Sequence, residues 1–183
     1  FDVTEPDTRT DYYDSRFSLA LDFWLTVAQK FKDRAILYEL WNEPISGSEE
    51  EEGGDPAYWK IYRPFWRVLT DAIRTSGNTN VILAAPPLWA FNARGLAASL
   101  LPDENTAYAW HVYAGQPPED WADALDTLDQ EKPVVVTEWG FEPGAKQHWA
   151  GTAAEYGQPF AAFMDERSLS STASAIWCAA ATF

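Results

Sequence analysis

The sequence is poor in cysteine and in basic residues, and it lacks long apolar runs. Cys178 is the single cysteine among 183 residues, so no intrachain disulfide can form and no cysteine-based metal site is expected. Thirteen basic residues against 28 acidic ones give a net charge of −15, which disfavours nucleic acid and anionic membranes as partners and favours neutral or cationic ones. No apolar run approaches the roughly 18 residues that a membrane helix needs.

The length allows one domain with a sizeable core. At 183 residues the chain is nevertheless shorter than the roughly 250 residues of an ordinary eight-stranded α/β barrel. It begins at Phe1, with no initiator methionine and no basic start followed by a hydrophobic segment, so we expect a processed chain or a piece of a longer one. We predict a single domain over residues 1–183, with a polar loop or arm at residues 1–13.

Apolar runs and amphipathic segments alternate along the chain. Runs that are typical of buried parallel strands occur at residues 35–41, 81–85, 106–113, 133–138 and 174–180. The intervening patterns predict helices at residues 14–32, 55–77, 94–100, 117–130 and 153–167. In the second of these helices we expect the buried face to consist of Ile61, Phe65, Val68 and Ala72. The alternation predicts an α/β fold with parallel strands and right-handed crossovers.

Two of the predicted strands end in a glutamate beside a tryptophan. The first ends in WNEP (residues 41–44) and the fourth in TEWG (residues 137–140). Pro44 lacks a backbone donor and restricts Glu43 to an extended conformation at the strand's carboxyl end. Two carboxyl groups placed at the carboxyl ends of parallel strands could supply the pair that cleavage of a glycosidic bond requires.

These two motifs, in this order and with an aromatic-histidine strand between them, resemble the acid/base and nucleophile motifs of glycoside hydrolase family 5, a family of retaining glycosidases in clan A. The resemblance implies that Glu43 is the acid/base and Glu138 the nucleophile. It also implies an incomplete TIM-type (β/α) barrel of about five parallel strands, which correspond to strands four to eight. The family's additional arginine and histidine come from its second and third strands, which have no counterpart here.

The same resemblance assigns further substrate-binding residues. Asn42 matches the asparagine that binds the sugar hydroxyl next to the reacting carbon, although a turn-capping amide is the ordinary alternative. His111 would orient the substrate and Tyr113 would bond the nucleophile, and both face one side of a strand because they are two residues apart; a core histidine remains the alternative for His111. Trp177 matches the family's sugar-platform tryptophan, and Trp89 is a further candidate because an indole face stacks on a pyranose ring.

The expected function is that of a retaining, cellulase-like endo-β-1,4-glucanase acting on β-glucan, outside the cell. A β-mannanase is one alternative, and a weak or silent sugar-binding fragment that needs self-association or a partner is another, because the first and last strands have unpaired edges. We expect no cofactor and no zinc site, since the two histidines, His111 and His148, lie far apart in sequence. The acidic segment 49–55 is predicted to be a solvated loop; a cation site there is the alternative, although the spacing of a calcium loop is absent.

Overall fold

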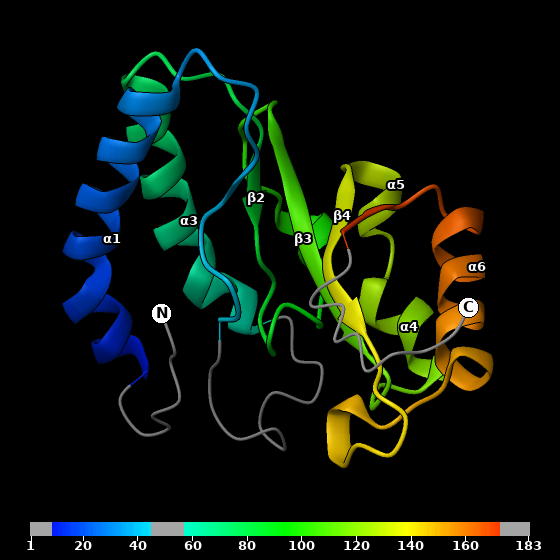
Figure 1. Cartoon of the computed structure of the whole chain (residues 1–183). Helices are drawn as coiled ribbons and strands as arrows, with labels where there is room; N and C mark the ends of the chain where they lie inside the picture. The colour runs from blue at the N-terminus through cyan, green and yellow to red at the C-terminus, as the bar shows by residue number, and fades with distance from the viewer. Residues whose placement is uncertain (1–8, 45–56, 173–183) are drawn as a thin grey trace.

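A parallel sheet forms the centre of the computed structural model, which describes residues 9–44 and 57–172 (Figure 1). Its five strands lie in chain order, β1-β2-β3-β4-β5, and every neighbouring pair is parallel. The strands are β1 (Tyr38–Glu39), β2 (Ile82–Ala84), β3 (Thr106–Tyr113), β4 (Val134–Gly140) and β5 (Ser170–Ser171). The predicted α/β class, with five parallel strands, is therefore confirmed.

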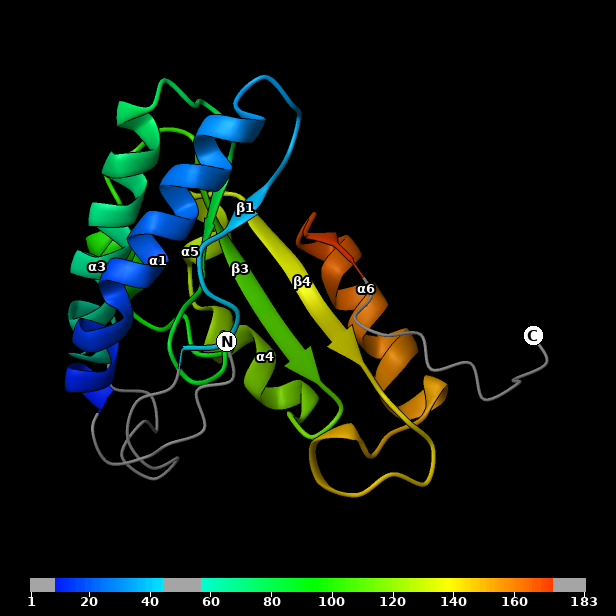
Figure 2. The same cartoon turned by 60° about the vertical axis from the view of Figure 1, so that its left-hand side comes forward.

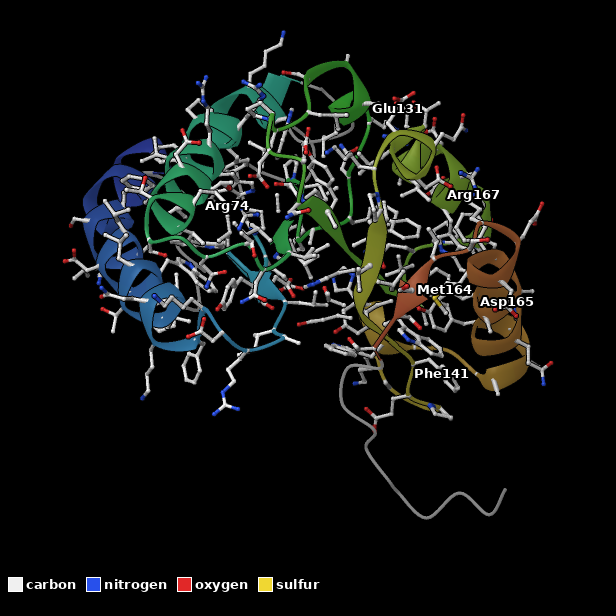
Figure 3. All side chains as sticks on the ribbon, turned by 90° about the horizontal axis from the view of Figure 1, so that it is seen from above. Arg74, Glu131, Phe141, Met164, Asp165 and Arg167 are labelled. Carbon is white, nitrogen blue, oxygen red and sulfur yellow. The ribbon has the colours of Figure 1, made fainter. Side chains whose placement is uncertain are left out.

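The helices cover one face of this sheet. Seen from above in Figure 3, they follow an arc outside the strands and leave the opposite side of the sheet free of helices. They are α1 (Arg9–Phe31), α3 (Ala57–Thr75), η1 (Leu96–Ser99), α4 (Pro118–Leu125), α5 (Leu128–Glu131), η2 (Gln147–Trp149), the π-helical turn η3 (Ala153–Gly157) and α6 (Gln158–Glu166). Among the described residues, none of the helices combines the length and apolarity that crossing a bilayer takes.

The two faces of the sheet carry side chains of different size. Because successive side chains in a strand point to opposite faces, Trp110 and its neighbours at alternate positions of β3 pack against the helices, where Trp110 contacts Phe160 and Phe163 of α6. The other face buries a separate cluster of mostly small residues, namely Leu83, Ala85, Ala90, Ala107 and Ala109. The large core therefore lies between the sheet and the helices, and a smaller cluster fills the other face of the sheet.

Helix α3 buries a different stripe from the one predicted. Val68 is 46% exposed, and the predicted Phe65 is only half-buried, with its ring edge-on to Phe17 of α1 at 5.3 Å. The fully buried positions on α3 are instead Trp59, Tyr62, Trp66, Leu69 and Ile73. Both stripes are apolar, but the aromatic one removes far more surface from water and so faces the sheet.

Several predicted boundaries differ from the structure, mostly by a few residues, and three of the differences change an element. Helix α1 begins at Arg9, so residues 9–13, predicted as part of an arm, are helical, and residues 1–8 lie outside the described part. The single helix predicted at 117–130 is two helices, because Asp126 has a φ of 55° and interrupts the backbone pattern between α4 and α5. The described fifth strand is Ser170–Ser171, beside β4, whereas the predicted strand 174–180 lies outside the described residues.

Candidate functional site

Glu43 and Glu138 reach the same end of the sheet from strands that are not neighbours. Glu43 follows β1, and Glu138 lies near the carboxyl end of β4, which runs beside β3 toward the same end (Figure 2). One carboxylate oxygen from each glutamate and a ring nitrogen of His111 all lie within 4.8 Å of one another. Glu43 and Glu138 are 95 positions apart in the sequence, and His111 lies between them. The structure brings all three to the carboxyl ends of the strands, where parallel α/β folds carry their chemistry.

His111 is the centre of this cluster and is 1% exposed. Its Nδ1 lies 3.1 Å from Glu43 Oε1 and 3.6 Å from Glu138 Oε2. Its Nε2 lies 2.9 Å from Thr137 Oγ1 and 3.3 Å from Glu39 Oε1. Both ring nitrogens therefore face an oxygen of at least one carboxylate.

An irregularity in the sheet places two consecutive side chains against His111. The register between β3 and β4 pairs Trp110 with Val136 but His111 with Glu138, so that Thr137 is an extra residue on β4. Consecutive residues of a regular strand point to opposite faces, whereas a bulge re-aims them. Thr137 and Glu138 can both face the imidazole for this reason.

The Glu138 carboxylate has a second partner in Tyr113. The Tyr113 hydroxyl donates to Glu138 Oε2 at 2.5 Å. The Tyr113 ring also packs against Trp149 of η2, with ring centroids 4.3 Å apart, and Trp149 remains 47% exposed. A hydroxyl fixed on one oxygen leaves the other oxygen of Glu138 available for a reaction.

The surroundings of His111 change its pKa in both directions. Burial lowers the pKa of the imidazole, but the hydrogen bonds to Glu39 and Glu43 and the charges of Glu138 and Glu39 raise it, to about 9 overall. The carboxylates around the ring thus outweigh its burial and favour the protonated imidazole.

The loop after β2 supports the segment that carries Glu43. Leu88, Trp89 and Ala90 have φ values of 56°, 52° and 61°, and three successive non-glycine residues in the left-handed region store strain. Hydrogen bonds hold this turn on two sides: the Trp89 N–H donates to the Pro44 carbonyl at 3.2 Å, and the His111 N–H donates to the Ala90 carbonyl at 3.1 Å. The turn therefore places Trp89, which is 37% exposed, next to the residue that follows Glu43.

The remaining predicted residues lie outside this cluster or outside the described part of the chain. Asn42 is exposed and lines a cavity of about 270 Å³ together with Trp24, Glu39 and Trp41, among others. Trp177 lies outside the described residues, as does the acidic segment 49–55. His148 is exposed on η2, where its carbonyl accepts the Gly115 N–H at 2.8 Å.

Sequence reasoning missed Glu39 and Thr137. Glu39 sits in an otherwise apolar strand segment, ILYEL, and an acidic side chain in such a run needs a partner; this was the available signal. Thr137 belongs to the TEWG motif, but its contact with His111 depends on the bulge. Arg63 and Arg94 bond elsewhere: Arg63 donates to the carbonyls of Ser99 and Leu100, and Arg94 pairs with Asp123.

Glu43, His111 and Glu138 are also residue types that ligate metals. A ligating imidazole must offer a nitrogen lone pair, whereas each His111 nitrogen here faces carboxylate oxygen as a hydrogen-bond donor would. The geometry favours an ion-pair cluster over a metal site.

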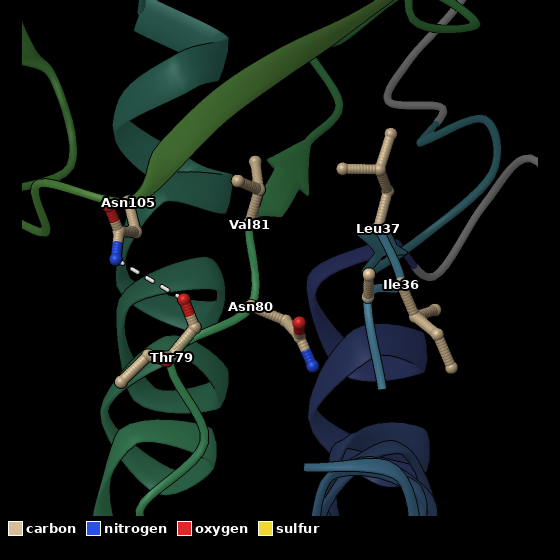
Figure 4. A pocket seen from close by; sticks show the side chains of 7 residues that line it. Ile36, Leu37, Thr79, Asn80, Val81 and Asn105 are labelled. Carbon is tan, nitrogen blue, oxygen red and sulfur yellow. Dashed lines mark hydrogen bonds between the residues drawn. The ribbon is translucent and has the colours of Figure 1, made fainter. Parts of the chain in front are cut away.

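A larger cavity lies at the other end of the strands. It measures about 390 Å³ and is formed by residues just before β1, β2 and β3, among them Ile36, Leu37 and Val81 (Figure 4). Asn105 donates to the Thr79 carbonyl across its rim at 3.2 Å. Since these residues precede the strands and the glutamates follow them, this cavity takes no part in the carboxylate site.

Comparison with known sequences agrees with the geometry. The family model described as cellulase (glycosyl hydrolase family 5) matches residues 3–181. Endoglucanase C from Evansella cellulosilytica is 35% identical over 144 residues, which are 66% of this chain and 17% of that protein. Endoglucanase N from Pectobacterium atrosepticum is 32% identical over 107 residues, which are 57% of this chain and 22% of that protein.

Comparison with solved structures identifies the same fold. The native β-glucanase SdGluc5_26A from Saccharophagus degradans superimposes with a TM-score of 0.76 at 21% identity, over 89% of this chain and 53% of that chain. The catalytic domain of endoglucanase Cel5A from Thermobifida fusca gives a TM-score of 0.72 at 22% identity, over 91% of this chain and 52% of that chain. The chain thus spans about half the length of these solved relatives, and a smaller part of the curated ones.

Proposed function

Since the chain belongs to the cellulase family, glycosyl hydrolase family 5, we propose that it is a retaining endo-β-1,4-glucanase that cleaves O-glycosidic bonds in β-glucan. Glu138 is the nucleophile and Glu43 the acid/base in this proposal. The distance between the two carboxylates carries it. Retaining glycosidases hold their carboxyl groups about 5 to 5.5 Å apart, whereas inverting enzymes need about 6.5 to 9.5 Å to admit a water. Oxygens of Glu43 and Glu138 within 4.8 Å of each other support the retaining class.

The proposed reaction has two displacements. In the first, a Glu138 oxygen bonds to the anomeric carbon, the bond from that carbon to the leaving oxygen breaks, and Glu43 transfers its proton to that oxygen. In the second, Glu43 takes a proton from water, the water oxygen bonds to the anomeric carbon, and the ester to Glu138 breaks. Tyr113 keeps its bond to Oε2, so Glu138 attacks with a fixed orientation.

The sugar assignment rests on the aromatic and polar groups around this pair. Trp89 and Trp177 would offer apolar faces to glucose rings, and Asn42 would bond the hydroxyl beside the reacting carbon. The relatives' names support a β-glucan, and the Saccharophagus degradans β-glucanase has been solved in complex with cellotetraose. A β-mannan is the alternative substrate. Because such polymers do not enter cells intact, we propose an extracellular location.

Rescue by azide tests the two roles separately. In Glu138→Ala, the removed carboxylate leaves room for azide, which would attack an activated aryl β-cellobioside once and give the α-glycosyl azide. In Glu43→Ala, azide would attack the glycosyl enzyme and give the β-glycosyl azide. Glu104→Ala, an exposed glutamate before β3, is the control and should hydrolyse like wild type. If neither variant forms an azide while both retain hydrolysis, the assignment is wrong.

A second candidate function is favoured by the edge of the sheet. Strand β1 pairs only with β2 among the described residues, and five large apolar side chains of α1 and the segment before β1 are exposed, namely Leu19, Phe23, Leu25, Ile36 and Leu37. An unpaired edge beside apolar surface is suited to association. We propose that a second copy or another barrel fragment covers this edge if the isolated chain is silent. Light scattering at several protein concentrations tests this association, and Leu37→Lys should dissociate the complex. A wild-type monomer that hydrolyses glucan would contradict the proposal.

A further inference from the structure

Glu39 lies on the far side of His111 from the two glutamates of the proposed reaction. It contacts Nε2, whereas Glu43 and Glu138 are near Nδ1. The Thr137 hydroxyl donates to Glu39 Oε1 at 3.2 Å. The lone pairs of Thr137 Oγ1 therefore remain available to accept a bond from the His111 Nε2–H, 2.9 Å away. Glu39 Oε1 and Thr137 Oγ1 thus both lie at Nε2 of His111, where each can accept a hydrogen bond from the ring.

This arrangement is satisfied by an imidazole that carries a proton on each ring nitrogen. A neutral imidazole has one N–H and one lone pair, and a lone pair on Nε2 would meet Glu39 and a Thr137 hydroxyl that already donates to Glu39, so Nε2–H fits that side. On the other side Nδ1–H can donate to Glu43 Oε1 whether the Glu43 carboxyl is ionised or protonated. His111 is 1% exposed, so water cannot take the place of either acceptor, and an unpaired charge or lone pair in this position would be strongly unfavourable.

The proposed reaction moves one negative charge past His111. Before the first displacement the charge is on Glu138 and the proton on Glu43; afterwards Glu138 is esterified and Glu43 is ionised. Nδ1 lies 3.6 Å from the first carboxylate and 3.1 Å from the second. A protonated His111 can therefore compensate the negative charge of Glu138 before the displacement and that of Glu43 after it, and the imidazole does not have to move.

We propose that Glu39, acting with Thr137, is a positioning residue that holds His111 as an imidazolium, the stationary counter-ion for the charge that passes between Glu138 and Glu43. The catalytic part of this inference rests on the proposed function, whereas the protonation of His111 does not. Within residues 9–44 and 57–172, the charged groups that face His111 are Glu39 and Glu43 from the β1 segment and Glu138 from β4, and Tyr113 donates to Glu138. The raised pKa of the imidazole agrees with this placement.

Nuclear magnetic resonance of the histidine side chains tests the protonation directly. The chain has two histidines, so ¹⁵N-labelling gives two imidazole signals, and His148→Gln assigns them. In the wild-type chain we expect His111 to stay doubly protonated through neutral pH. Glu39→Gln should lower its midpoint by at least about one pH unit, a tenfold loss of proton affinity, and leave His148 unchanged.

Matched variants separate the effect of Glu39 from a general change of charge. Glu104→Gln makes the same chemical change at an exposed glutamate and should leave the His111 midpoint unchanged. Glu39→Asp keeps a carboxylate at this position, so the His111 midpoint should lie between those of Glu39→Gln and wild type. Equal midpoints in wild type and Glu39→Gln, or a neutral His111 in the wild-type chain at pH 7, would overturn the inference. If Glu39→Gln does not fold, Thr137→Val should lower the midpoint by a smaller amount, and an unchanged midpoint overturns the inference.

Kinetics adds the catalytic readout. On an aryl β-cellobioside, the alkaline limb of kcat/KM for Glu39→Gln should move to lower pH together with the His111 midpoint, while Glu104→Gln keeps the wild-type profile. A shifted midpoint with an unshifted limb refutes the counter-ion role. A wild-type chain that hydrolyses no glycoside refutes the proposed function for the chain by itself, and the histidine titration still decides whether Glu39 holds the imidazolium.

Discussion

Replacing His111 by glutamine should remove a pH-dependent part of the stability. The pKa of His111 is raised from 6.5 to about 9 in the folded chain, and a shift of one unit corresponds to about 1.36 kcal/mol. The full shift amounts to roughly 3 kcal/mol, of which we expect roughly 2 to 3 kcal/mol because the partner carboxylates are partly screened by water. The sign follows from proton linkage. Between pH 6.5 and 9 the folded chain keeps a proton that the unfolded chain has lost, so the free energy of unfolding falls as pH rises.

Urea unfolding at half-unit steps from pH 6 to pH 10, followed by tryptophan fluorescence, measures this contribution. The stabilisation should be fully present below pH 6.5 and should disappear as pH approaches about 9. The difference between the two curves reports His111 together with the carboxylates that are coupled to it. His148→Gln, which changes the exposed histidine, should run parallel to wild type. Parallel curves for wild type and His111→Gln would refute the reasoning.

Three further predictions concern the hydroxyl at the nucleophile, the core and the contact between the loops after β3 and β4. Tyr113→Phe removes the 2.5 Å bond to Glu138, and we expect kcat on an aryl β-cellobioside to fall about 10- to 100-fold, since a hydrogen bond to a charged group contributes about 1.5 to 3 kcal/mol. Phe160→Ala, at a fully buried position, should lower the free energy of unfolding by about 3 to 5 kcal/mol in urea titrations; a loss below about 1 kcal/mol would contradict this packing. Gly115→Ala would place a Cβ 2.6 Å from the His148 Cα, so the backbone at one of the two residues must move. Calorimetry should show a destabilisation of about 1 to 3 kcal/mol. An unchanged unfolding temperature would contradict this close contact.

The positions of the central strands could be predicted because their sequence is unambiguous. The apolar run at 106–113 coincides with β3, and the run at 133–138 covers most of β4. Strand β3 is buried along its whole length, β4 is buried or half-buried, and neither offers a competing helical pattern. Helix α3 was harder because it has two apolar stripes, and only the packed structure shows that the stripe with Trp59 and Trp66 faces the sheet.

The convergence of Glu43 and Glu138 could be predicted from strand order alone, since parallel strands bring their carboxyl ends to one edge of the sheet. The environment of His111 could not. It depends on the bulge at Thr137, for which no local sequence pattern is specific, and on Glu39, whose contact with a histidine 72 positions away is a tertiary event. The break at Asp126 was also unpredictable, because its φ of 55° is uncommon outside glycine.

Trapping with a 2-fluoro-β-cellobioside tests the central claim most directly. The fluorine slows hydrolysis of the glycosyl enzyme, so the ester accumulates and can be located by mass spectrometry of peptides. The predicted result is one glycosyl unit on the peptide that carries Glu138, formed more slowly in Tyr113→Phe and absent in Glu138→Gln. A glycosyl unit on any other residue, or a chain that hydrolyses the unfluorinated glycoside to the α-anomer without forming an ester, would contradict the account.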